Sequence, residues 1–191
     1  MIDANDIEPV KPTAIPGRDI AMIICAAQMA SISGKREPWK FLVVRDKDKI
    51  TALKEVCLKE AMGRFADRQD KTESREQYAD RCQSRFGNYF SAPVCIVVLT
   101  GDKSSCPNGH HWDGPLAAGH LMLAARALGY GTAFITDTIP DRMTREILGI
   151  PDQFTRVCIT PVGIPFGRPG SPPLQELDEL VVCETPWTPS G

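Results

Sequence analysis

The sequence lacks any apolar run near the roughly 20 residues that a helix needs to cross a bilayer. Its first residues, MIDANDIEPVKPTAIPG, also lack the apolar core of a secretory signal. The formal net charge of −2 provides no general attraction to nucleic acid or to acidic membranes. The seven cysteines are odd in number, and several sit inside apolar stretches: Cys25, Cys95, Cys158 and Cys183. This pattern indicates buried thiols in a reducing compartment, not a disulfide framework, and we expect a cytoplasmic protein.

The usual catalytic motifs are missing as well. There is no G-x-S-x-G elbow, no G-x-x-x-x-G-K-[ST] phosphate loop and no H-E-x-x-H pair, and Gly129-Tyr-Gly131 lacks the third glycine of a dinucleotide fingerprint. The segment 106–113 contains Cys, His and Asp residues, but no second ligand pair stands at a standard zinc spacing, so a loop is favoured over a metal site. His120 lies on an apolar helix pattern, where a hydrogen-bonded core or interface histidine is favoured over a ligand.

What the sequence does contain is an alternation of helices and buried strands. Apolar spacing predicts helices over 18–30, from Asp46 through Cys57, from Asp113 to Gly129 and over 141–149. Buried strands are predicted over 40–44, 91–101, 131–136 and 157–163. These elements predict a three-layer α/β or α+β domain over 18–166, with an extended arm at 1–17 and a Pro-rich arm at 167–191.

Two of these segments carry more specific predictions. Asp113 is expected to cap the N-terminus of its helix, with Pro115 in the first turn, and the near absence of a polar face predicts burial on most sides. The charged segment 63–88 is predicted to be a solvent-facing helix or a mobile excursion. A solvated face is favoured there over a substrate lid.

The stretch SISGKREPWKFLVV (31–44) joins a loop of small and charged residues to a buried strand. Small residues let backbone N–H groups approach a flat or anionic ligand, and Lys35 and Arg36 add positive charge. Pro38 fixes the chain direction, and Trp39 is expected to anchor the junction by burying its ring. A ligand-binding loop and an ordinary surface turn have about equal weight on these residues alone.

The stretch AAQMASISGKREPWKFLVVRD resembles the loop–strand junction of the FMN-dependent nitroreductase family, and its E-P-W is similar to the iodotyrosine deiodinase branch. The resemblance continues through SAPVCIVVLTG, DGPLAAGHLMLAARALGYGTAFITD and LGIPDQFTRVCITPVGIP. These pieces cover most of residues 20–166 in the family's order. Four pieces in the right order are a far more specific signal than any one of them.

The resemblance implies a homodimer of α+β subunits, each with a central, mostly antiparallel sheet flanked by helices in three layers. Two FMN sites would lie at the interface, and the termini would embrace the partner. The apolar helix from Asp113 to Gly129 would be an interface helix, and the C-terminal arm at 167–191 would pack on the partner subunit.

The resemblance also implies site residues. By position, the residues that match the FMN-contacting loop of the family are Ser31, Ile32, Ser33 and Lys35. Thr136 and Asp137 match the strand-end pair near flavin N5, and Thr136 is the predicted catalytic residue. The arginines that usually hold the FMN phosphate are missing near the N-terminus, and so is the basic pair near the C-terminus. The substitutes that we consider are Lys11, Arg18, Arg36 and Arg168.

The function implied by the resemblance is an FMN-dependent oxidoreductase. It would take hydride from NAD(P)H and reduce an electron-poor acceptor such as a nitroaromatic or a quinone, with Lys35 near the flavin pyrimidine. Two alternatives remain open. One is a dimer of the same fold with weak or no FMN binding and no redox turnover, and the other is a reductive dehalogenase or a flavin-fragmenting relative.

Overall fold

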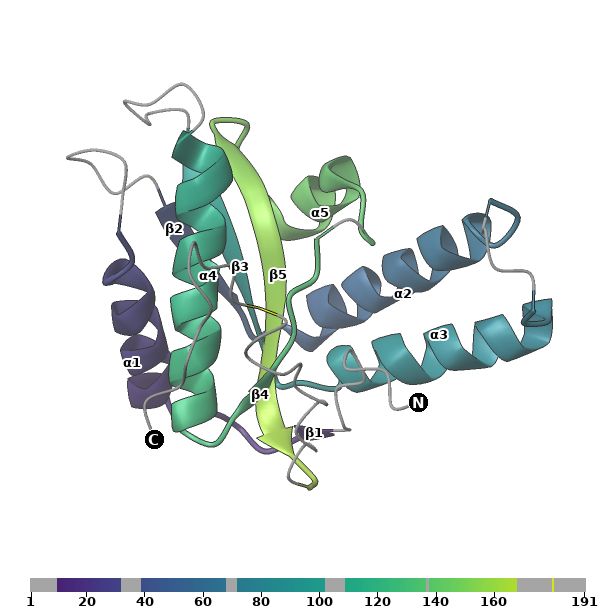
Figure 1. Cartoon of the computed structure of the whole chain (residues 1–191), viewed down its shortest axis with the longest axis horizontal. Helices are drawn as coiled ribbons and strands as arrows, with labels where there is room; N and C mark the ends of the chain where they lie inside the picture. The colour runs from purple at the N-terminus through teal and green to yellow at the C-terminus, as the bar shows by residue number, and fades with distance from the viewer. Residues whose placement is uncertain are drawn as a thin grey trace.

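The centre of the molecule is an antiparallel sheet made from the apolar runs of the sequence (Figure 1). The computed structural model describes residues 10–31, 39–67, 72–101, 109–136, 138–167 and 180. The strands in these ranges are β1 (Val10–Lys11), β2 (Trp39–Val44), β3 (Val94–Gly101), β4 (Gly131–Thr132) and β5 (Phe154–Pro165). Their order is β1–β5–β3–β2, and β4 pairs with β5. Every pair is antiparallel, which makes the domain α+β.

Helices cover both faces of this sheet, so the fold has the three layers that the sequence predicts (Figure 1). One face carries α1 (Gly17–Gln28) and α4 (Gly109–Ala127), which pack against each other. The other face carries α2 (Lys47–Gly63), α3 (Arg75–Tyr89) and α5 (Asp141–Leu148). The described part of the chain contains these five helices.

The three longer strands β2, β3 and β5 supply both cores, because successive side chains point to opposite faces. Val94, Ile96 and Val98 of β3 pack with the side of α1 and α4 that contains Ile23 and Leu121. The alternate residues of β3 pack under α2 and α3. A strand buried on both faces must be apolar at nearly every position, and that explains the continuous run VCIVVL.

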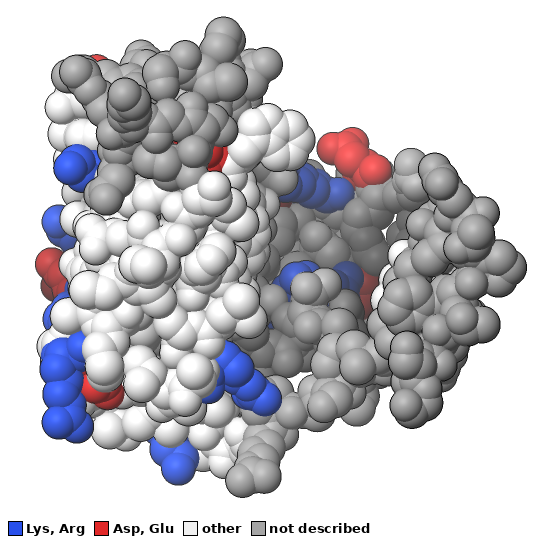
Figure 2. Space-filling model, turned by 60° about the vertical axis from the view of Figure 1, so that its left-hand side comes forward, with Lys and Arg blue, Asp and Glu red and all other residues white. Residues whose placement is uncertain are grey.

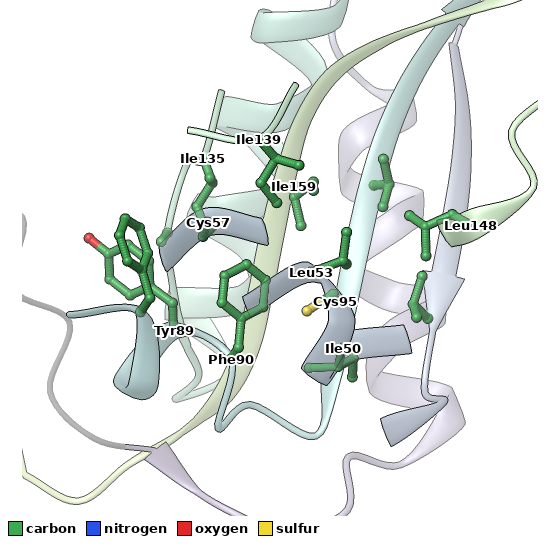
Figure 3. Close-up of a cluster of buried hydrophobic side chains, with 14 of the residues drawn as sticks. Ile50, Leu53, Cys57, Tyr89, Phe90, Cys95, Ile135, Ile139, Leu148 and Ile159 are labelled. Atoms are coloured by element: carbon green, nitrogen blue, oxygen red, sulfur yellow. The ribbon is translucent and has the colours of Figure 1, made fainter. Parts of the chain in front are cut away.

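The second core is closed by residues from distant parts of the chain. Figure 3 shows Ile50, Leu53 and Cys57 of α2 gathered with Ile135, Ile139 and Ile159. Both the segment after Thr132 and the strand β5 therefore meet α2 here. Side chains from α3 and its C-terminal end, among them Tyr89 and Phe90, fill the adjoining space.

The charged segment 63–88 is more integrated than the sequence analysis predicts. Where the structure describes it, α3 begins at a capping box: the Gln77 N–H donates to Ser74 Oγ at 3.1 Å, and the Ser74 N–H donates to Gln77 Oε1 at 2.9 Å. Its buried side chains are Tyr78, Cys82, Phe86 and Tyr89. Because they recur every three or four residues, they form one apolar stripe in a charged background.

The helix expected from Asp113 begins earlier, at Gly109, so that prediction is wrong at its start. Asp113 is buried inside α4 instead of capping it, and Pro115 lies in the helix interior. The reason is the close approach of Gly114 to the sheet: a Cβ built there would lie 2.4 Å from Val157 and 2.9 Å from Thr100. Contact of this kind packs the first turns of α4 closely against the sheet.

Two further expectations need correction. The strand predicted over 131–136 is reduced to β4 and an isolated bridge between Ile135 and Ile159, because Phe134 turns outward and is exposed. Cys25 is exposed, whereas Cys95 and Cys158 are buried as predicted. Cys25 lies on the outer side of α1, and Cys183 lies outside the described residues.

Candidate functional site

Two of the predicted site residues, Ser31 and Thr136, lie in the described part of the chain. Ser31 is exposed just beyond α1, and Thr136 is half-buried just after the bridge between Ile135 and Ile159. The remaining ones lie outside the described residues: Ile32, Ser33, Lys35, Arg36, Asp137 and Arg168. Trp39 is buried on the α1 side of the sheet, which confirms that its ring anchors the start of β2.

Ser31 and Thr136 follow elements that belong to different cores. Ser31 follows α1, which lies on one face of the sheet (Figure 1). Thr136 follows Ile135, which bridges to β5 and packs into the core of the other face.

Thr136 is held in place by a buried arginine, Arg156 of β5. The guanidinium Nη1 of Arg156 donates to the Thr136 carbonyl at 2.8 Å, and its Nη2 donates to the Ile139 carbonyl at 2.8 Å. The Arg156 side chain is only 7% exposed. The planar fork of the guanidinium matches two carbonyl oxygens at once, so the turn between them is fixed relative to β5.

An irregularity in β5 explains why a charged side chain enters this apolar layer. The pairing of β3 with β5 shifts between Val98 and Leu99, so that Val98 faces Cys158 and Leu99 faces Arg156. Val157 is thus an additional residue in β5, which is the mark of a β-bulge. Because of this residue, Arg156 lies opposite Leu99 and shares its side of the sheet, where Leu99 packs with α2.

Asp141, at the start of α5, supplies the opposite charge. Its Oδ1 lies 3.7 Å from Arg156 Nε, and its Oδ2 accepts a hydrogen bond from Arg145 Nε at 2.6 Å. Arg145 also donates to the carbonyls of Pro151 and Phe154. The hydrogen bond from Arg145 and the ion pair with Arg156 therefore place Asp141 between the two arginines, at the point where α5 meets β5.

The hydrogen-bond donors of Thr136 remain available. Its carbonyl is occupied by Arg156, but within the described part of the chain neither its hydroxyl nor its N–H has a hydrogen-bond partner. A flavin ring nitrogen can accept a hydrogen bond, and a half-buried donor pair on a fixed backbone can supply it. The residue type and its surroundings therefore fit the position beside N5 that the family resemblance implies.

The cations considered for the FMN phosphate include two described residues, Lys11 and Arg18. Lys11 Nζ lies 6.0 Å from the ring centroid of Phe166. Arg18 is 84% exposed and pairs with Asp19 at 3.3 Å. Both residues are exposed.

An apolar stripe stands open on the outer side of α4. Trp112 is 73% exposed, Leu116 43% and Leu123 71%. Figure 2 shows a broad area without charged side chains on the part of the surface that is turned forward, with basic side chains at its margin. Single exposed apolar residues are common, but several along one helix mark an interaction surface. In a single chain α4 is thus buried on one side only, contrary to the expectation of burial on most sides.

Other candidate groups carry ordinary structural roles. His120 Nδ1 lies 3.0 Å from the Leu116 carbonyl, in agreement with the predicted hydrogen-bonded histidine. Burial raises the pKa of Cys57 and of Cys95 to about 12, so neither thiol supplies a nucleophile near neutral pH. The described residues contain no cluster of three metal-binding side chains, and none of their helices is both long and apolar enough to span a membrane.

Arg156 is the residue that the sequence analysis missed. Its signal was present: a single arginine interrupts the apolar strand segment FTRVCITPV. A charge in a buried strand needs a partner, but a pattern of residues does not show which carbonyls and which carboxylate will surround it.

The comparisons with known proteins agree with this architecture. The Nitroreductase family model matches residues 7–164, and the chain belongs to the nitroreductase family. An Archaeoglobus fulgidus protein provisionally named NADH dehydrogenase/NAD(P)H nitroreductase is 28% identical over 158 residues, which cover 79% of this chain and 75% of that protein.

The iodotyrosine deiodinases are also similar to this chain. Mouse iodotyrosine deiodinase 1 is 26% identical, and the match covers 88% of this chain but only 62% of that protein. A crystal structure of an iodotyrosine deiodinase bound to FMN and 3-iodo-L-tyrosine superposes with a TM-score of 0.74 at 21% identity. The superposition covers 95% of this chain and 94% of the deiodinase chain, so the two chains have the same fold.

Proposed function

We propose that this protein is an FMN-dependent oxidoreductase that takes hydride from NAD(P)H and reduces an electron-poor acceptor such as a nitroaromatic or a quinone. The observation that carries the proposal is Thr136: a half-buried residue with a fixed carbonyl and two available donors, in a chain that belongs to the nitroreductase family. FMN, when bound, supplies the acceptance and donation of hydride.

The chain's own residues bind and orient the flavin in this proposal. Thr136 donates a hydrogen bond toward N5 through its hydroxyl or its N–H, and Asp137 adjoins it. The loop of the other subunit, with Ser31, Ile32, Ser33 and Lys35, lines the flavin, and the Lys35 charge stabilises the electron-rich pyrimidine of the reduced form.

The phosphate is the part of FMN for which the chain departs from its family. We propose that Lys11, Arg18, Arg36 or Arg168 bind it in place of the usual arginines. Lys11 and Arg18 are exposed and contribute less than a preformed arginine clamp, because each must be ordered when the anion binds. FMN affinity is therefore expected to fall as the salt concentration rises.

A homodimer completes the site. Ser31 and Thr136 follow elements that belong to different cores, and the exposed stripe on α4 has the composition of an interface core. We propose that this stripe packs against a second copy and that residues 167–191 pack on the partner subunit. We place the dimer in the cytoplasm, where the described cysteines would remain free thiols.

A visible absorption spectrum after FMN loading and desalting tests the cofactor. We expect flavin bands at about one FMN per subunit, followed by bleaching with NADH or NADPH under anaerobic conditions and recovery with a nitroaromatic or a quinone. A protein that holds FMN but recovers its colour only with 3-iodo-L-tyrosine would be a reductive dehalogenase. A colourless protein would instead support the dimer without redox function.

A further inference from the structure

We infer that Arg156 is a positioning residue for the flavin site: it holds the backbone turn from Thr136 to Asp141 so that Thr136 presents its donors toward N5. The inference rests on the proposed function. It begins with the two hydrogen bonds of 2.8 Å from one guanidinium to the carbonyls of Thr136 and Ile139. Two residues lie between Thr136 and Ile139 in the sequence, and the planar fork fixes the spacing of the two carbonyls.

The turn has little other backbone support on the Thr136 side. The pairing with β5 stops at the bridge between Ile135 and Ile159, two hydrogen bonds of 3.1 and 2.8 Å. Beyond that bridge, within the described residues, the Thr136 carbonyl is fixed by Arg156 alone. The orientation of the following backbone therefore depends on this side chain.

The choice of arginine follows from the number of acceptors. A lysine ammonium is a compact charge that can reach one carbonyl well, whereas arginine reaches both in fixed geometry. The Asp141 carboxylate at 3.7 Å balances the charge, so the arginine can stay buried. Arg156 acts at a distance from the ligand, through the backbone that it holds.

Arg145 provides a matched control. It is also an arginine, it binds the same Asp141, and it donates to two carbonyls, but these belong to Pro151 and Phe154 and not to the Thr136 turn. Arg142 provides a surface control, because its side chain is 86% exposed and forms an ion pair with Glu146 of the same helix. Neither control residue contacts Thr136 in the described part of the chain.

The experiment compares Arg156→Lys, Arg145→Lys and Arg142→Lys in the full-length protein. FMN affinity is measured by flavin fluorescence titration, and the position of the bound flavin absorption bands is recorded. We expect Arg156→Lys to weaken FMN binding by about tenfold or more and to shift the bands. The two controls should stay within about twofold of the wild type, with unshifted bands.

A double-mutant cycle with Thr136→Val separates positioning from a general loss of stability. If Arg156 acts through Thr136, Arg156→Lys should change the flavin bands much less in the Thr136→Val background than in the wild type. Hydrogen exchange of the peptide that covers residues 133–141, measured without FMN, should be faster in Arg156→Lys than in Arg142→Lys.

The outcomes are distinct. Suppose that the wild type holds FMN. Unchanged FMN affinity in Arg156→Lys, an equal loss of affinity in Arg145→Lys, or additive effects in the cycle would then overturn this inference. Each of these results would leave the proposed function standing. A wild type that holds no FMN would overturn both. If Arg156→Lys does not fold, Asp141→Asn decides: we expect it to weaken FMN binding severalfold, and unchanged binding would overturn the inference.

Discussion

The helices on the two faces of the sheet bury their inner sides equally well but differ on their outer sides. On one face, α2 and α3 turn charged side chains outward, so their outer sides are solvent-exposed. On the other face, α4 exposes an apolar stripe, and α1 exposes Met22 and Met29. Since the cores beneath are alike in burial, the difference lies in the outer surfaces. The outer surface of α4 is apolar, and it is the surface that we propose packs against a second copy.

The chemistry differs between the faces too. Arg156, Asp141 and Arg145 lie on the side of α5, where Arg156 binds the Thr136 and Ile139 carbonyls. Ser31 follows α1, on the other face. In the function that we propose, one face therefore supplies the donor at Thr136, and the other supplies the surface that packs against a second copy.

The strongest test of this difference is the substitution Leu123→Asp on α4. A carboxylate in the centre of an apolar interface, present once in each subunit, should raise the dissociation constant of the dimer more than about 100-fold. Sedimentation at several protein concentrations measures it. Gln83→Asp on the exposed side of α3 is the control and should leave association unchanged. A wild type that is monomeric at all concentrations would contradict the proposed dimer.

The next largest effect is expected at Gly114, where α4 meets the sheet. Gly114→Ala places a methyl group within 2.4 Å of Val157 and should lower the free energy of unfolding by about 1–3 kcal/mol. Gly87→Ala in α3, where a Cβ meets nothing within 4 Å, should raise it by about 0.5–1 kcal/mol, because alanine is the better helix former. Urea unfolding of both variants measures the two changes in unfolding free energy. Changes of the same sign would contradict the packing argument.

A smaller loss is expected on the solvent-exposed side, at the capping box of α3. Ser74→Ala removes the acceptor of the Gln77 N–H and should cost about 1 kcal/mol of unfolding free energy. Ser84→Ala, at an exposed position inside the same helix, should change stability by less than about 0.5 kcal/mol. Thermal unfolding compares the two. The prediction fails if Ser84→Ala is the more damaging change.

The smallest effect concerns pH and the hydrogen bond of 2.5 Å from the Tyr130 hydroxyl to Asp19. Burial, followed by this bond to Asp19, raises the pKa of Tyr130 to about 12 from an ordinary value of 10.0. Neutral Tyr130 therefore stabilises the fold fully below about pH 10, and this contribution is lost as the pH rises toward 12.

Tyr130→Phe tests that pH dependence. The difference in unfolding free energy between the wild type and Tyr130→Phe should be constant from pH 7 to about pH 9 and should shrink above about pH 10. The buried thiols of Cys57 and Cys95 also titrate near pH 12, but they are common to both proteins and cancel in the difference. A difference that grows with pH would contradict the assigned pKa shift.

Much of the fold could be predicted from the sequence, because buried elements leave strong patterns. Continuous apolar runs gave β2 and β3, and helical spacing gave α1, the start of α2 and α5. The family resemblance supplied the α+β class and the antiparallel sheet, and the family match bears it out. The boundaries were weaker where long-range contacts decide them, as at the start of α4 and at the shortened strand β4.

The site divides in the same way. The residue types could be read from the sequence: a threonine at 136, a run of small residues from Ser31, and an apolar α4. Local pattern is enough for these, because hydrophobicity and backbone preference belong to each residue and its neighbours. The hydrogen bond from Arg156 to the carbonyl of Thr136, twenty residues earlier, could not be read in this way. Such contacts depend on a bulge in β5 and on the order of strands in the sheet, and both arise only when distant segments pair.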